Sequence, residues 1–200
     1  MKLFCLLPLA GALVLAAPAS RAATRFCDAF KSKTDPAWGD QSGAWTIAKK
    51  RYYATQPSNA PLSYTDLVAD QNFRTETVSV TVHNVYDGGV WLRSHWNGAA
   101  NGILLVVGGA YSNYTGLYWH VVTNGVVGPA QNEVDVPGLQ GSTVKLKIVA
   151  KGTTYSVFVN GATTATTALT DTTYSSGSVG LYDNSASPQE SFGPFCVSGK

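Results

Sequence analysis

Apolar and polar residues alternate along this chain in short runs, which are separated by Gly, Asn, Asp and Pro. In "TVSVTVH", the residues Val78, Val80 and Val82 fall on one face, and "STVKLKIVAKG" places its lysines opposite its apolar residues. A period of two is typical of half-buried strands. Because no helical pattern of any length occurs beyond residue 22, the sequence predicts an all-β fold.

Tight reversals divide these runs. Hairpin turns are expected at Asn124-Gly125, Lys151-Gly152 and Asn160-Gly161. About a dozen strands without an internal repeat favour a two-sheet antiparallel sandwich over a propeller or a solenoid, which would show a period.

The first 22 residues read as a secretory signal peptide, with the basic Lys2, an apolar run from Leu3 to Ala17 and a cleavage point after Ala22. The predicted domain organisation is therefore a signal peptide, 1–22, and one jelly-roll domain, 23–200. No later run is long and apolar enough to span a bilayer. A soluble protein is expected, secreted or extracellular, and periplasmic in a Gram-negative host.

The charge of the chain points to no charged partner. Lys2 and Arg21 lie in the predicted leader, so the 14 basic and 12 acidic residues become 12 and 12 after cleavage. This balance gives no indication of a nucleic acid or a membrane as partner.

Cys5 lies in the predicted leader, so two cysteines remain after cleavage. These two, Cys27 and Cys196, are expected to form a disulfide in an oxidising compartment. Because this disulfide would close a very long loop, it could stabilise the fold by about 5 kcal/mol.

The order of these features resembles the concanavalin A-like lectin/glucanase jelly roll, in its laminin G-like and 3-keto-disaccharide-hydrolase-like branches. The resemblance covers nearly the whole mature chain and implies a jelly-roll fold, but members of the superfamily include lectins, glycosidases, lyases and adhesion domains. The segments that carry it are "FCDAF...W" (26–38), "GAWTIAKKRYY" (43–53), "GGVWLRS" (88–94), "GLYWHVV" (116–122), "VKLKIVAKGTTYSVFVNG" (144–161) and the closing "GSVGLYDN...FGPFCV".

No catalytic residues are predicted. Glycoside hydrolysis usually needs two carboxylates across the scissile bond, and the Glu-x-Asp-x-x-Glu strand of the related glucanases is absent. Glu133 and Asp135 are the nearest fragment, and we interpret them as solvated acids. Serine occurs in no Gly-x-Ser-x-Gly elbow, and the histidines have no His-x-His or His-Glu-x-x-His spacing. Neighbouring strands could still bring His95 and His120 together at a zinc ion, but the sequence offers no third ligand.

No cofactor is expected apart from a possible structural calcium ion, because many proteins of this fold hold one. Asp28 and Asp183 are the candidate ligands, and carbonyl oxygens could complete the shell. Both acids could equally form turns, and the turn is the favoured interpretation.

The candidate ligand-binding residues come from "GGVWLRSHW" and "GLYWHVV". In the first segment, alternation places Trp91, Arg93 and His95 opposite the aliphatic Val90 and Leu92. Aromatic rings bind the apolar faces of sugars, and charged groups fix the hydroxyls. In the alternative reading, Trp91 packs under a loop, and a slip of one residue would exchange the two faces.

The second segment adds two more candidates. Tyr118 and His120 are expected on the outer side, opposite Leu117, Trp119 and Val121. Between the two segments, "GILLVVGG" is apolar on both faces, as in a central strand covered on both sides. The leading hypothesis is a secreted lectin-like domain that binds a glycan or oligosaccharide. The alternatives are a glycan-acting hydrolase on the same fold and an extracellular adhesion domain that binds protein.

Overall fold

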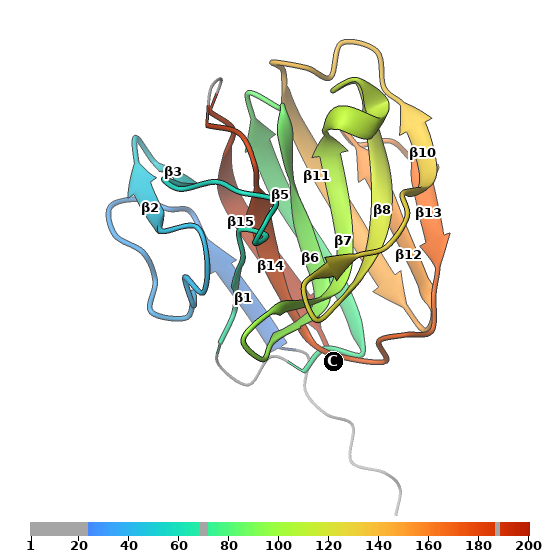
Figure 1. Cartoon of the computed structure of the whole chain (residues 1–200), viewed down its shortest axis with the longest axis horizontal. Helices are drawn as coiled ribbons and strands as arrows, with labels where there is room; N and C mark the ends of the chain where they lie inside the picture. Colours follow the sequence, from blue (N-terminus) through green and yellow to red (C-terminus); the bar gives the residue numbers. More distant parts are fainter. Residues whose placement is uncertain (1–23, 69–71, 187–188) are drawn as a thin grey trace, which may run out of the picture.

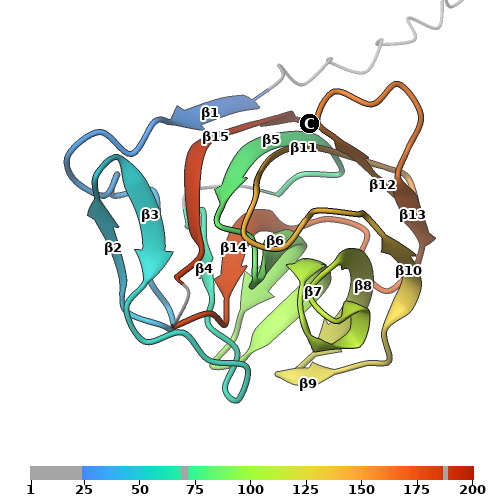
Figure 2. The same cartoon turned by 90° about the horizontal axis from the view of Figure 1, so that it is seen from above.

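The computed structural model describes residues 24–68, 72–186 and 189–200, which form two antiparallel sheets packed face to face (Figures 1 and 2). The predicted two-sheet sandwich is confirmed. The predicted signal peptide, 1–22, lies outside the described residues. Within those residues, no helix has the length and hydropathy that crossing a membrane would require.

The larger sheet has eight strands. Seven follow the order β13-β12-β11-β5-β15-β3-β2, and β1 pairs with β15. The predicted reversal at Lys151-Gly152 joins β11 to β12. The bounds are β1 Thr24–Asp28, β2 Trp45–Ala48, β3 Arg51–Ala54, β5 Thr75–His83, β11 Thr143–Lys151, β12 Thr154–Val159, β13 Thr167–Thr170 and β15 Ser191–Gly199.

The second sheet has seven strands, in the order β10-β8-β7-β6-β14-β4 with β9 paired to β8. Strands β6, β7 and β8 form a meander, and the short 3-10 helix η1 connects β7 to β8. Figure 1 draws this sheet in front of the larger one. The bounds are β4 Thr65–Asp66, β6 Asp87–Trp96, β7 Ala100–Gly108, η1 Ala110–Ser112, β8 Gly116–Thr123, β9 Val126–Val127, β10 Gln131–Asp135 and β14 Ser178–Asp183.

The main hydrophobic core lies between the two sheets. Val78, Val80 and Val82 of β5 belong to it, as the alternation of their strand predicts. Val90 and Leu92 of β6 join the same cluster from the opposite sheet. Each such side chain gains about 1.5–3 kcal/mol from burial, so this layer is the main source of stability for the sandwich.

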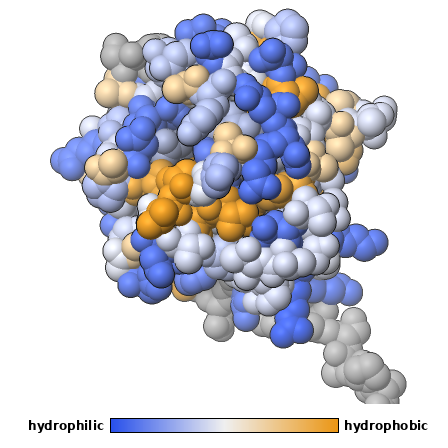
Figure 3. All heavy atoms as spheres, turned by 45° about the vertical axis from the view of Figure 1, so that its right-hand side comes forward, coloured by the Kyte–Doolittle hydropathy of each residue, from blue (hydrophilic) through white to orange (hydrophobic). Residues whose placement is uncertain are grey.

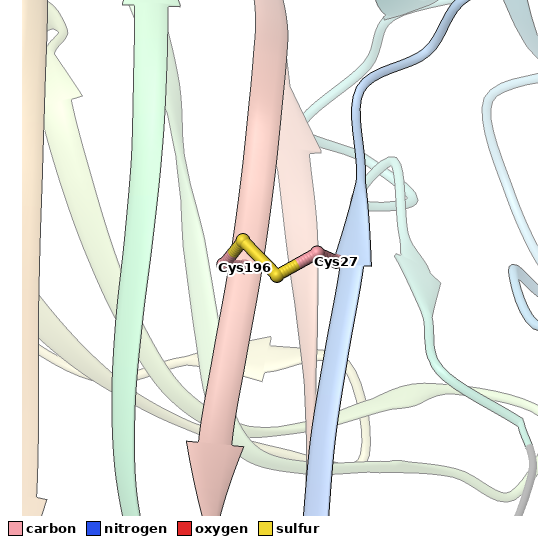
Figure 4. The surroundings of a disulfide bond; sticks show 2 residues. All are labelled: Cys27 and Cys196. Carbon is pink, nitrogen blue, oxygen red and sulfur yellow. A yellow bond between two sulfur atoms is a disulfide. The ribbon is translucent and has the colours of Figure 1, made fainter.

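The disulfide between Cys27 and Cys196 is present, as predicted (Figure 4). The two cysteines are direct neighbours in the register of β1 and β15, with their Cα atoms 4.1 Å apart. They are separated by 169 positions in the sequence. The bond therefore joins the first and last described strands across the width of one strand pair.

A β-bulge interrupts β6 between Leu92 and His95. At this point Arg93 has a φ of 47°, and its side chain lies between the sheets, with only 1 % of its surface exposed. The Arg93 Nε atom is 3.8 Å from Oε1 of Glu76, and its guanidinium carbon lies 5.0 Å from the centre of the Tyr155 ring. The bulge adds one residue to the strand and so reverses the alternation of its side chains.

Candidate functional site

A second apolar layer covers the outer face of the seven-stranded sheet. Trp91 belongs to this layer, whereas Val90 and Leu92 belong to the main core, so alternation predicted the side of Trp91 correctly. Its ring is completely buried, and Leu62 and Tyr64, from the segment between β3 and β4, pack in the same layer. The rings of Tyr64 and Trp91 are 5.2 Å apart. Trp91 therefore supports the outer face from below without reaching its surface.

Above this layer is a pocket of about 280 Å³, which we name the outer pocket. Its floor comes from β7, β8 and β14, and η1 and β9 contribute to its rim. Figure 3, in which the right-hand side of Figure 1 is turned forward, shows a band of hydrophobic surface bordered by polar residues. The polar and aromatic side chains that line the outer pocket are Asn59, Asp87, Tyr111, Tyr118, His120 and Tyr182.

Three aromatic rings meet edge to face in the outer pocket. Tyr111 of η1 lies 5.6 Å from Tyr118 and 5.8 Å from His120, and the latter two rings are 5.3 Å apart. Tyr118 and His120 are almost buried, whereas 64 % of the Tyr111 surface is exposed. Tyr111 is therefore the ring that can stack on a ligand, and the other two position it.

Asp87, the first residue of β6, supplies a carboxylate to the same pocket. Its Oδ2 accepts a hydrogen bond of 2.8 Å from the Asn184 side chain. Burial raises the pKa of Asp87, and Asn184 and His120 partly oppose this effect. Gly109 has a φ of 91°, and a Cβ atom there would collide with the Tyr118 hydroxyl and press on Oδ1 of Asp87. The glycine thus allows η1 to come close to both polar groups.

His120 presents an uncharged ring at neutral pH. Burial is the largest influence on its pKa, which is lowered, although Gly128 and Asp87 act in the opposite direction. Its Nδ1 lies 2.7 Å from the carbonyl oxygen of Gly128. Because a carbonyl can only accept, Nδ1 carries the proton and the ring is held in one orientation.

The structure brings together Tyr118 and His120 of the five predicted ligand-binding residues, and it separates the other three. Arg93 was expected beside Trp91, but the bulge turns it inward, where it donates hydrogen bonds to the carbonyl oxygens of Tyr174 and Arg74. His95 is exposed beyond the bulge, 5.4 Å from the Tyr174 ring. It lines a different pocket at the far end of β6.

Sequence reasoning missed Asp87 and Tyr111 as candidates. Asp87 stands at the start of β6, one residue before the segment "GGVWLRSHW" that supplied the predicted ligand-binding residues. Tyr111 lies in "AYSNYTG", which has no strand alternation. The cluster of tyrosines beside glycine was the available signal, because aromatic residues in a loop need a reason to remain uncovered.

Asp28 and Asp183, the candidate calcium ligands, lie on strands of different sheets, β1 and β14. Oδ1 of Asp28 accepts a hydrogen bond from the Phe30 amide. This contact forms a turn, which was the favoured interpretation of Asp28 from the sequence. The Asp183 carboxylate accepts hydrogen bonds from the amides of Ser185 and Ala54. Among the described residues, no three His, Cys, Asp or Glu side chains are grouped so that they could hold a metal ion.

Glu133 and Asp135 are both exposed on β10. Asp135 accepts a hydrogen bond from the Thr115 hydroxyl, and neither acid lines the outer pocket. This placement matches the interpretation of the two residues as solvated acids.

No protein-family model and no curated protein matches the sequence. Similar solved structures include a Bacillus subtilis protein of unknown function with a galectin-like fold, with a TM-score of 0.63 and 12 % identity over 88 % of this chain and 96 % of that chain. Peanut lectin bound to a nine-residue peptide gives a TM-score of 0.59 and 14 % identity over 90 % and 98 %.

The carbohydrate-binding module CBM66 of Bacillus subtilis gives a TM-score of 0.57 and 18 % identity, over 82 % of this chain and 92 % of the module. Identities this low inform about the fold alone. The chain has the concanavalin A-like jelly-roll fold, which confirms the predicted fold class.

Proposed function

We propose that this chain is a lectin-like domain that binds a glycan in the outer pocket. The observation that carries the proposal is the uncovered ring of Tyr111 at a pocket that also holds the Asp87 carboxylate and the His120 imidazole. An aromatic ring can stack on the apolar face of a sugar while a few fixed polar groups bind its hydroxyls. The similarity in fold to a lectin and a carbohydrate-binding module supports this function.

Each polar group has a distinct role in the proposed complex. The Asn184 side chain donates a hydrogen bond to Oδ2 of Asp87. Within the described residues Oδ1 accepts no hydrogen bond, so Oδ1 can accept one from a sugar hydroxyl. Asn59 lines the same pocket, and its side-chain amide can both donate a hydrogen bond to a sugar hydroxyl and accept one from it. The buried positions of Tyr118 and Tyr182 keep the floor of the pocket rigid, which lowers the entropy cost of binding.

Binding without turnover is favoured over hydrolysis. Glycoside hydrolysis normally places two carboxylates on either side of the scissile bond. Asp87 is the one carboxylate among the described residues that line the outer pocket. A hydrolase that uses histidine and tyrosine instead is the second candidate, and it would release product from an oligosaccharide. The proposed location is extracellular, which the disulfide supports because such bonds persist in oxidising compartments.

The test is a glycan array, followed by calorimetry with the oligosaccharide that the wild type retains best. Tyr111→Ala and Asp87→Asn should each weaken binding about tenfold or more without changing the melting temperature. Lys145→Ala is the control, because Lys145 is exposed on β11 of the other sheet. Full affinity in both pocket variants, or no retention of any glycan, would overturn the proposal. Appearance of product would identify the hydrolase.

A further inference from the structure

The second pocket, with a volume of about 430 Å³, lies at the other end of β6, beyond the bulge. Asp66, Ser94 and Trp96 line it, together with the polar side chains of Gln41 and Asn72. Trp96 packs against the same apolar layer that forms the floor of the outer pocket. The two pockets are therefore on the same face of the same sheet.

The polar groups of the second pocket are held in place. The Asp66 carboxylate is 5 % exposed and accepts a hydrogen bond of 2.6 Å from the Tyr64 hydroxyl. Gln41 donates to the same carboxylate and accepts from the Asp66 amide at 3.2 Å. The Ser94 hydroxyl is buried and makes no hydrogen bond within the described residues. The base of this pocket thus combines fixed acceptors with a polar group that has no partner.

A row of aromatic rings in tilted and edge-to-face contact lies beneath the surface between the two pockets. The Trp96 ring is 5.3 Å from Tyr64, Tyr64 is 5.2 Å from Trp91, and Trp91 is 6.5 Å from Tyr182 in the floor of the outer pocket. Unlike the buried Trp91, Trp96 is partly exposed, so its ring is available to a ligand. Asp87 and Ser94 are seven residues apart on β6, and because the bulge takes up one residue of this span, their separation is about 20 Å.

We propose that the second pocket is a sugar subsite, and that the ligand is a neutral oligosaccharide or polysaccharide chain that extends from the outer pocket, above the buried rings of Trp91 and Tyr64, to Trp96. This inference rests on the proposed function of the outer pocket. The separation of the pockets is too large for one sugar ring. Each pocket carries a carboxylate, and among the described residues neither is lined by a lysine or arginine that would attract an anionic sugar.

The experiment measures affinity by calorimetry for a series from the disaccharide to the octasaccharide of the neutral sugar that the glycan array identifies. In the wild type, affinity should rise with length until the chain reaches Trp96. Trp96→Ala should weaken binding of the octasaccharide about tenfold and leave the disaccharide unchanged. Trp96→Phe, which keeps a ring on Tyr64, should retain most of the affinity for the longer chain.

Val68→Trp provides a variant that removes no packing, because Val68 lines the second pocket and is 56 % exposed. It should obstruct the second pocket and cause the same selective loss even if Trp96→Ala fails to fold. Equal affinity for short and long chains in the wild type would overturn the inference while leaving the proposed function intact, as would an unimpaired octasaccharide affinity in Val68→Trp. Absence of binding to every oligosaccharide would overturn both.

Discussion

Replacing Trp91 by alanine separates the packing role of this ring from a binding role. The side chain is completely buried and lies 5.2 Å from Tyr64 and 6.5 Å from Tyr182. Large aromatic-to-alanine changes in a core cost about 3–5 kcal/mol, because the transfer free energy is lost and a cavity remains. In a domain of this size, each kcal/mol lowers the melting temperature by about 2–4 °C. Trp91→Ala should therefore melt roughly 10 °C below the wild type.

The assay is thermal unfolding followed by circular dichroism, with two control variants. Trp91→Phe keeps a ring against Tyr64 and should lose much less stability than Trp91→Ala. Tyr111→Ala removes a ring that is 64 % exposed, so its free energy of unfolding should stay within about 0.5 kcal/mol of the wild type. If Trp91→Ala melts with the wild type and yet loses ligand binding, the ring contacts the ligand, and the burial argument is refuted.

Two further predictions concern the stability of the sandwich. Replacing both Cys27 and Cys196 by serine should lower the free energy of unfolding by about 2–5 kcal/mol in denaturant titrations, with ligand affinity retained; an unchanged midpoint would show that the bond contributes nothing. Burial raises the pKa of Glu76 to about 8, against the opposing effect of Arg93, and raises that of Asp183 to about 6. The folded state therefore holds these protons at pH values where the unfolded chain has released them, so the free energy of unfolding should fall by about 2 kcal/mol or more between pH 5 and pH 8. Glu76→Gln should reduce this slope, and a rise in stability over the same interval would contradict the prediction.

The sequence predicted the faces of uninterrupted strands well. Val78 to Val82 and the pair Leu117 and Tyr118 lie on the expected sides, because one face of each strand must be buried. Alternation failed at Arg93, where the bulge adds a residue. A bulge leaves little trace in one sequence when a residue other than glycine takes the left-handed conformation, as Arg93 does.

The candidate site could be predicted only in part. Tyr118 and His120 follow from strand alternation, but the cover over Trp91 comes from the segment between β3 and β4, which has no periodic pattern. Asp87 and Tyr111 meet in the outer pocket only because η1 folds back at Gly109. Contacts of this kind depend on tertiary structure, so local patterns contain no information about them.

The disulfide makes nearly the whole described chain a covalent ring, and this changes what a protease can do to it. The loop between β12 and β13 is exposed at residues 161–164, so it is an accessible place for cleavage. A cut there would leave Cys27 on one fragment and Cys196 on the other, with the bond still joining them. Strand β5 of the first fragment would also remain paired with β15 of the second. A nicked molecule would therefore migrate as one band without reductant and as two bands with it, while the β6–β7–β8 surface stays within a single fragment.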